Sequence, residues 1–142
     1  MRFMALDIGE RRIGIAISES GLLATPHSVM LRRSKREDFA KLGRLMAELK
    51  IEQVIIGVPY SLDGPEKIGP QARRVLRYAQ ALAKTVETPF EYFDESYSTV
   101  DAESYLLASG SKKVPLDAAA AAVILQNYLD TTQLNPQDKT TS

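Results

Sequence analysis

The chain has 142 residues, of which 44% are hydrophobic and 25% charged, the composition of a soluble domain with a substantial core. It has no cysteine and one histidine, which excludes disulfides and thiolate sites and argues against zinc, so any metal would be Mg²⁺ or Mn²⁺ held by oxygen. No segment has the pattern of a membrane span or a signal peptide, so we expect a cytoplasmic protein without a membrane partner.

The formal net charge is zero, but the two halves of the chain differ. Residues 1–78 hold 14 basic and 9 acidic side chains, whereas residues 79–142 hold 4 and 9. Such segregation can give a neutral protein a basic face beside an acidic pocket, provided that it survives folding. Zero net charge therefore does not exclude a nucleic-acid partner.

The first apolar run, Phe3–Ile8, lacks the alternation of a half-exposed strand, so it predicts a central strand covered on both faces. Asp7 lies near its end, where a buried carboxylate needs hydrogen-bond donors or a cation. A carboxylate that only caps a turn explains Asp7 equally well. Gly9 permits a positive φ and Gly14 a close backbone approach, which favours a hairpin with its tip at Glu10 and Arg11.

The next elements alternate between strand and helix. A third strand is expected at about Ala24–Leu31, where Pro26 suits an edge position or a bulge. Ser34 and Glu37 form a capping-box pattern before an amphipathic helix that ends near Lys50.

The β-branched run Val54–Pro59 then predicts a second buried strand, parallel to the first because a helix precedes it. Pro70 opens another helix, on whose exposed side Arg73 and Arg77 are spaced to point the same way. They are either an ordinary solvated surface or a track for a phosphate backbone.

A third parallel strand, Pro89–Phe93, ends in the adjacent carboxylates Asp94 and Glu95, which repel each other unless a cation lies nearby. A helix is expected from about Ser98 to Ala108. The basic linker with Lys112 and Lys113 follows it.

The last helix is expected from Leu116 to about Leu129, with small alanines that allow close packing. Asp117 stands in its first turn, where the helix dipole alone is a sufficient reason for a negative charge. Residues 131–142 are polar and aperiodic, which predicts a disordered tail after a single domain of residues 1–130.

Together these elements predict a mixed α/β sheet with Phe3–Ile8 at its centre. Ligands of open α/β sheets bind beyond the carboxyl ends of the parallel strands, so Asp7, Asp94 and Glu95 should share one edge. Asp117 joins them if the last helix begins at that edge. Such carboxylates are typical ligands of one or two Mg²⁺ or Mn²⁺ ions, which can clamp the attacking water and the leaving oxygen of a phosphodiester. The predicted chemistry is two-metal phosphodiester hydrolysis.

Several stretches, in order over nearly the whole chain, carry a family resemblance: Asp7 to Ala16, Gly57 to Pro59, Asp63–Gly64, Asp94–Glu95, Ser98–Thr99, Lys112–Lys113, Asp117, Ala121–Ala122 and Ile124 to Leu129. They resemble the YqgF/RuvX family, described as Holliday junction resolvases or as nucleases that mature the ends of pre-16S ribosomal RNA. The resemblance implies a ribonuclease H-like five-stranded sheet in the order 3-2-1-4-5, with strand 2 antiparallel. It also implies metal ligands at Asp7, Glu95 and Asp117, with Arg12 near the phosphate.

We therefore expect a nuclease acting on the 5′ end of pre-16S rRNA in ribosome biogenesis. We expect it to be a monomer or homodimer, with ribosomal precursor particles as a further binding partner. A resolvase of branched DNA is the alternative. A sugar-kinase-like ATPase also opens with Asp-Ile-Gly, but the chain is too short for the second domain that it needs. The expected nucleic-acid contacts are Arg11, Arg12, Arg73, Arg77, Lys112 and Lys113.

One position departs from the family pattern. Ser96 stands where the family usually carries an arginine after the Asp-Glu pair, and serine cannot replace that charge. Arg11 and Arg12 are the candidates to compensate for it. The departure also leaves open a catalytically weak RNA-binding module.

Overall fold

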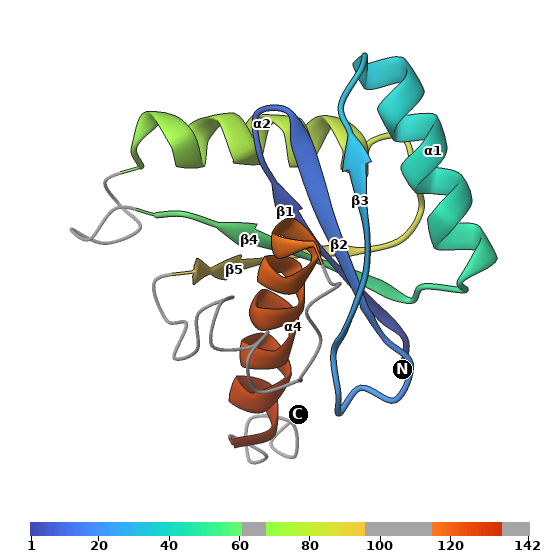
Figure 1. Cartoon of the computed structure of the whole chain (residues 1–142), viewed down its shortest axis with the longest axis vertical. Coiled ribbons are helices and arrows are strands. Elements are labelled where there is room, and N and C mark those ends of the chain that lie inside the picture. Colours follow the sequence, from blue (N-terminus) through green and yellow to red (C-terminus); the bar gives the residue numbers. More distant parts are fainter. Residues whose placement is uncertain (61–67, 96–114, 135–142) are drawn as a thin grey trace.

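The computed structural model of the protein describes residues 1–60, 68–95 and 115–134. The elements are β1 (Phe3–Ile8), β2 (Arg12–Ser18), β3 (Thr25–Leu31), α1 (Lys35–Glu48), β4 (Gln53–Val58), α2 (Pro70–Ala83), β5 (Phe90–Asp94) and α4 (Leu116–Leu134). The sheet has the strand order β3-β2-β1-β4-β5, in which β1 pairs antiparallel with β2 and parallel with β4 (Figure 1). This confirms the expected order and the central place of β1.

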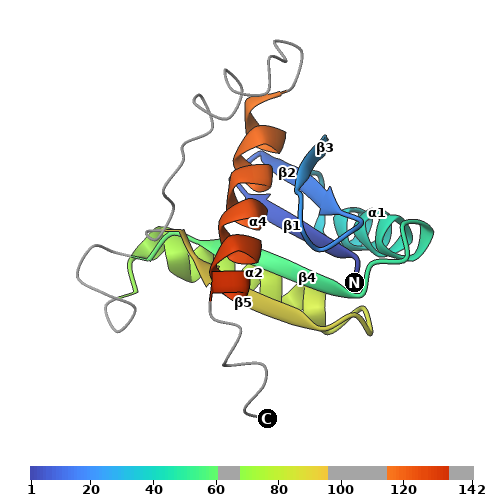
Figure 2. The ribbon, with the colours of Figure 1, turned by 90° about the horizontal axis from the view of Figure 1, so that it is seen from below.

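The sheet is covered on both faces, which is why β1 has no polar side. Met4, Leu6 and Ile8 belong to the core formed with α1 and α2, whereas Ala5 belongs to the core formed with α4. Figure 2 shows α4 on one side of the sheet and α1 and α2 on the other. Since side chains alternate along a strand, Asp7 shares the α4 face with Ala5.

The predictions for the edge strand and the first helix cap are confirmed. β3 is an edge strand, and Pro26 lies beside a register shift that falls between Ile15 and Ala16 of β2. Ser34 caps α1, because its Oγ accepts a hydrogen bond from the Glu37 main-chain N at 3.2 Å.

Two glycines shape the carboxyl end of β1. A Cβ on Gly14 would overlap the main-chain carbonyl of Asp117, so the predicted close approach is confirmed, and the approaching element is α4. Gly9 does not adopt the positive φ that glycine permits, since Gly21 (φ 82°) is the only glycine of the described ranges with a positive φ. At Gly9 the constraint is space: its N donates to Arg12 O at 2.9 Å, and a Cβ would lie 2.9 Å from that same oxygen.

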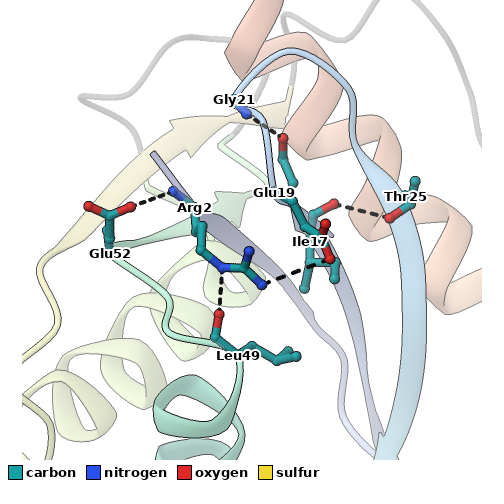
Figure 3. A network of polar contacts seen from close by, with 8 residues as sticks. Arg2, Ile17, Glu19, Gly21, Thr25, Leu49 and Glu52 are labelled. Atoms are coloured by element: carbon teal, nitrogen blue, oxygen red, sulfur yellow. Dashed lines mark hydrogen bonds and ion pairs between the residues drawn. The ribbon is translucent and has the colours of Figure 1, made fainter.

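The opposite end of β1 is closed by Arg2, which ties three segments together (Figure 3). Its main-chain N donates to Glu52 Oε1 at 2.8 Å, its Nε donates to Leu49 O at 2.7 Å, and its Nη2 lies 3.8 Å from Glu19 Oε1. These contacts hold the start of β1 to the segment after α1 and to the segment after β2.

The last helix is longer than expected, since α4 runs to Leu134 rather than to about Leu129, and the start of the expected tail is helical. Polar side chains of its last turns bond within the helix: Thr132 Oγ1 donates to Tyr128 O at 2.8 Å, and Gln126 Nε2 donates to Asp130 Oδ1 at 3.0 Å. The rest of the expected tail and the helix expected near residues 98–108 lie outside the described residues. Within the described ranges, every helix is too short or too polar to reach across a lipid bilayer.

Candidate active site

Three carboxylates from distant parts of the chain come to one edge of the sheet. Asp7 lies near the end of β1, and Glu95 directly follows β5. Asp117 lies in the first turn of α4, above Gly14, which is the cross-strand partner of Asp7. The condition set by the sequence, that the last helix should begin at this edge, is met.

The electrostatic interactions among the three carboxylates centre on Asp7, which interacts with Asp117 and with Glu95. Burial and, to a lesser extent, the charge of Asp117 together raise the pKa of Asp7 to about 6. Burial and, to a lesser extent, the charges of Asp7 and Asp94 together raise the pKa of Glu95 to about 7. Asp7 therefore interacts with both Asp117 and Glu95. All these effects favour the protonated forms of Asp7 and Glu95, because negative charges are crowded in a buried place. A bound cation would offset that negative charge.

Gly57 of β4 makes room for Glu95. A Cβ at this position would lie 2.7 Å from Glu95 Oε1 and 2.5 Å from Ile124 Cδ1 of α4. The missing side chain thus admits both the carboxylate and the helix. The sequence signal for this role is a glycine inside a β-branched buried run, a pattern that by itself predicts only a strand.

Arg12 places a cation beside Asp117. Its Nε lies 3.2 Å from Asp117 Oδ2, with 61% and 42% of the two side chains exposed. Arg12 is therefore beside one of the carboxylates and accessible to a substrate, whereas its place near a substrate phosphate stays a prediction. Arg11 is its exposed neighbour on the β1–β2 turn.

Asp94 differs from the other predicted metal ligands. It is the last residue of β5. Because side chains alternate along a strand, Asp94 lies on the same face as Phe90 and Tyr92, which pack against the core formed with α1 and α2. Asp94 thus lies toward the face opposite Asp7, and its effect on the site is to raise the pKa of Glu95. The geometry gives no support to Asp94 as a ligand.

The chemistry of the remaining three carboxylates suits Mg²⁺ or Mn²⁺. Their donors are all oxygen, which is the preference of both ions, and Asp7 is coupled to the other two. In the described parts of the chain, however, no group of three or more His, Cys, Asp or Glu side chains is placed to hold a metal ion. The metal site remains a prediction, and it requires the side chains of Glu95 and Asp117 to close around Asp7.

Two of the other predicted nucleic-acid contacts, Arg73 and Arg77, belong to α2. Arg73 and Arg77 are exposed and line one shallow hollow on α2, so they do point the same way. However, α2 covers the sheet face opposite α4. Lys112 and Lys113, like Ser96, lie outside the described residues.

Comparison with solved structures supports the fold. RuvC of T. thermophilus in complex with a Holliday junction substrate matches with a TM-score of 0.62 at 14% identity, covering 94% of this chain and 96% of that one. The yeast mitochondrial Holliday junction resolvase Ydc2 matches with a TM-score of 0.57 at 8% identity, covering 98% and 82%. The protein therefore has a RuvC-like ribonuclease H fold.

Comparison by sequence gives the family. Two relatives named "Putative pre-16S rRNA nuclease" are similar to almost the whole chain. That of Halothermothrix orenii is 37% identical over 135 residues, covering 92% of this chain and 95% of the relative, and that of Crocosphaera subtropica is 39% identical over 132 residues, covering 89% and 91%. Residues 1–131 match the family described as "RuvX: Holliday junction resolvase". The chain therefore belongs to the RuvX family, also called YqgF.

Proposed function

We propose that the protein is a metal-dependent endonuclease that hydrolyses phosphodiester bonds in structured RNA, with the 5′ end of pre-16S rRNA as its substrate. The observation that carries this proposal is the coupling of Asp7 to both Glu95 and Asp117 at one sheet edge, beside the exposed Arg12. The names of the sequence relatives support RNA as the substrate.

In this proposal Asp7, Glu95 and Asp117 would hold one or two Mg²⁺ or Mn²⁺ ions. The chemistry supplied by such ions is a lower pKa of the attacking water and stabilisation of the leaving oxygen. Without a metal ion Glu95 has a raised pKa of about 7, so binding of the ion would have to displace a proton from Glu95 near neutral pH. Arg12 would donate to the phosphate, since its guanidinium is exposed and already held at the site by Asp117.

The test is cleavage of a pre-16S rRNA fragment by the purified chain with Mg²⁺ or Mn²⁺. Asp7→Asn should slow cleavage roughly 100-fold or more, because it removes the shared ligand. The matched control is Asp130→Asn, an exposed position of α4 where an amide can still accept the hydrogen bond from Gln126. Equal cleavage by wild type and Asp7→Asn would contradict the proposal, as would no cleavage at all.

Two alternatives are decided by the same assay. The family description favours four-way DNA junctions, so a junction should be supplied in parallel with the RNA, and faster cleavage of the junction would make branched DNA the substrate. The second alternative is a catalytically weak RNA-binding module, suggested by Ser96 in place of the family's arginine. For such a module we expect salt-dependent binding of RNA without metal-dependent cleavage.

A further inference from the structure

A basic pocket of about 410 Å³ lies at the sheet edge that carries Asp7, on the side of α1 and α2. Its walls are the β1–β2 turn, the segment from Arg32 to the start of α1, and the part of α2 from Gln71 to Tyr78. Its lining includes four cationic side chains and one carboxylate, which together define the arginine pocket: Arg32, Lys35, Arg74, Arg77 and Glu10.

Arg32 is fixed in this pocket by contacts in two directions. Its Nη1 donates to Gly9 O at 2.7 Å, and its guanidinium carbon lies 4.3 Å from the centroid of the Tyr78 ring. A guanidinium held this way loses little conformational entropy on binding an anion. Of its five N–H donors, the bond to Gly9 uses one, which leaves others for a ligand.

A buried polar pair supports the floor of the pocket. Tyr78, which is 3% exposed, donates from its hydroxyl to Asp38 Oδ2 at 3.1 Å, and Asp38 is 4% exposed. Asp38 Oδ1 also accepts from the Arg33 main-chain N at 3.0 Å. These bonds join the start of α1 to α2 and to the residue after Arg32. The ring of Tyr78 that lies against Arg32 is thus held in place by buried hydrogen bonds.

The β1–β2 turn connects the pocket with the carboxylates. Ile8 and Gly9 line the pocket, and Asp7, one residue earlier, faces α4. A polynucleotide strand bound at Asp7 that crosses this turn would therefore bring a neighbouring phosphate to the pocket. Cations clustered at the end of such a path are what a phosphate backbone requires.

We propose that the arginine pocket binds a backbone phosphate of the substrate, a few nucleotides from the bond that is cut. This proposal rests on the proposed function, because it assigns the path of the same nucleic acid. Arg74 and Arg77 bind the phosphate together with Arg32, and Glu10 opposes them. Glu10 Oε1 lies 3.6 Å from Arg74 Nη2 and is the one carboxylate in the lining, so it competes with the phosphate.

The first test compares two double variants with the same loss of charge. Arg74→Gln with Arg77→Gln removes two exposed cations of the pocket, and Lys41→Gln with Arg44→Gln removes two exposed cations of α1 outside it. Binding of the pre-16S rRNA fragment is measured by fluorescence anisotropy in EDTA, where metal-dependent cleavage cannot interfere. The pocket pair should weaken binding about tenfold or more. It should also lower the slope of log K against log salt by about 0.7 to 0.9, the value for one phosphate contact.

The second test predicts a gain. Glu10→Gln should tighten binding several-fold, whereas Glu19→Gln, at the opposite end of the sheet beside Arg2, should change it little at physiological salt. Equal effects of the two double variants, no gain from Glu10→Gln, or no RNA binding by the wild type would overturn the pocket. Cleavage that depends on Asp7 would then leave the proposed function standing. Pocket-dependent binding without any cleavage would instead refute the nuclease alone.

Discussion

Arg12 and Asp117 join the start of β2 to the first turn of α4 through an ion pair of 3.2 Å. Asp117 is also the charge that raises the pKa of Asp7. The guanidinium therefore offsets part of the negative charge at the sheet edge while no divalent ion is there. If Asp117 held a divalent ion, we expect its carboxylate to be less available to Arg12, whose exposed guanidinium could then contact a substrate phosphate.

Arg12→Gln should separate these two roles. Both side chains of the pair are substantially exposed, so the free energy of unfolding should change by less than about 1 kcal/mol. Mg²⁺ should bind more tightly, since it no longer competes with the guanidinium, whereas RNA should bind more weakly. Calorimetric titration with Mg²⁺ and anisotropy with RNA measure the two effects.

The control for Arg12→Gln is Arg11→Gln at the next position of the turn. Arg11 is exposed, and the hydrogen bond that its main-chain O accepts from Arg32 N survives the substitution. It should leave Mg²⁺ affinity unchanged. Weaker Mg²⁺ binding in Arg12→Gln than in Arg11→Gln would show that Arg12 does not compete with the metal.

The fold was predictable because its periodicities are local and unambiguous. The unbroken apolar run of β1 indicated a strand buried on both faces, and α1 and α4 do cover those faces. Pro26 indicated an edge, and β3 is one. The end of α4 was missed because side chains such as Thr132 have the composition of a tail, yet bond to the preceding turn of the helix.

The candidate site was only partly predictable, since its details depend on which face each residue takes. The topology rule brought Asp7, Asp94 and Glu95 to one edge and left Asp117 dependent on where the last helix begins. The alternation of β5, which places Asp94 toward the opposite face, requires the strand register. The arginine pocket was missed because Arg32 and Arg74 come from separate elements and meet only after both α1 and α2 pack on the sheet.

Gly57→Ala should damage both stability and activity. The added methyl group would lie 2.5 Å from Ile124 Cδ1 and 2.7 Å from Glu95 Oε1, so α4 or Glu95 must move. Overpacking of this kind costs about 1 to 3 kcal/mol, which urea unfolding measures. Cleavage in saturating Mg²⁺ should fall as well, because Glu95 is displaced from Asp7.

Gly43→Ala is the matched control for Gly57→Ala. Gly43 lies within α1, and its added Cβ would meet Val86 Cγ1 at an ordinary 3.5 Å. Because alanine favours the helix, this change should stabilise the protein by roughly 0.5 to 1 kcal/mol and leave cleavage intact. A Gly57→Ala protein as stable and active as Gly43→Ala would show that β4 does not need this space.

Stability without divalent ions should depend on the ionisation of Asp7 and Glu95. Their pKa values in the folded protein, about 6 and about 7, lie above the ordinary values of 3.8 and 4.5. The folded state therefore holds more protons than the unfolded state between these limits. The contribution of the two groups to stability is present below about pH 4 and is lost as pH rises through 6 to 7.

Asp7→Asn isolates this effect, because the amide has no charge at any pH. In EDTA, the variant should gain stability relative to the wild type as pH rises from about 4 to about 8, with each pKa unit worth about 1.4 kcal/mol. Mg²⁺ should remove much of the difference by stabilising the ionised wild type. Urea unfolding at several pH values measures it, and a difference independent of pH would contradict the raised pKa of Asp7.

Tyr78→Phe should separate the support of the arginine pocket from its binding surface. The change removes the hydroxyl that donates to Asp38 Oδ2 at 3.1 Å but keeps the ring beneath Arg32. The Asp38 carboxylate, which is only 4% exposed, then lacks one hydrogen-bond donor, and this should cost about 1 to 3 kcal/mol of stability. The control is Tyr60→Phe, at a partly buried ring, which should cost less than about 0.5 kcal/mol. Urea unfolding measures the loss of stability. RNA affinity, measured without urea where the variant is folded, should stay within about twofold of the wild-type value because the cations keep their places. Unchanged stability would mean that the bond to Asp38 does not hold α1 to α2, and a large loss of RNA affinity would mean that the ring alone does not position Arg32.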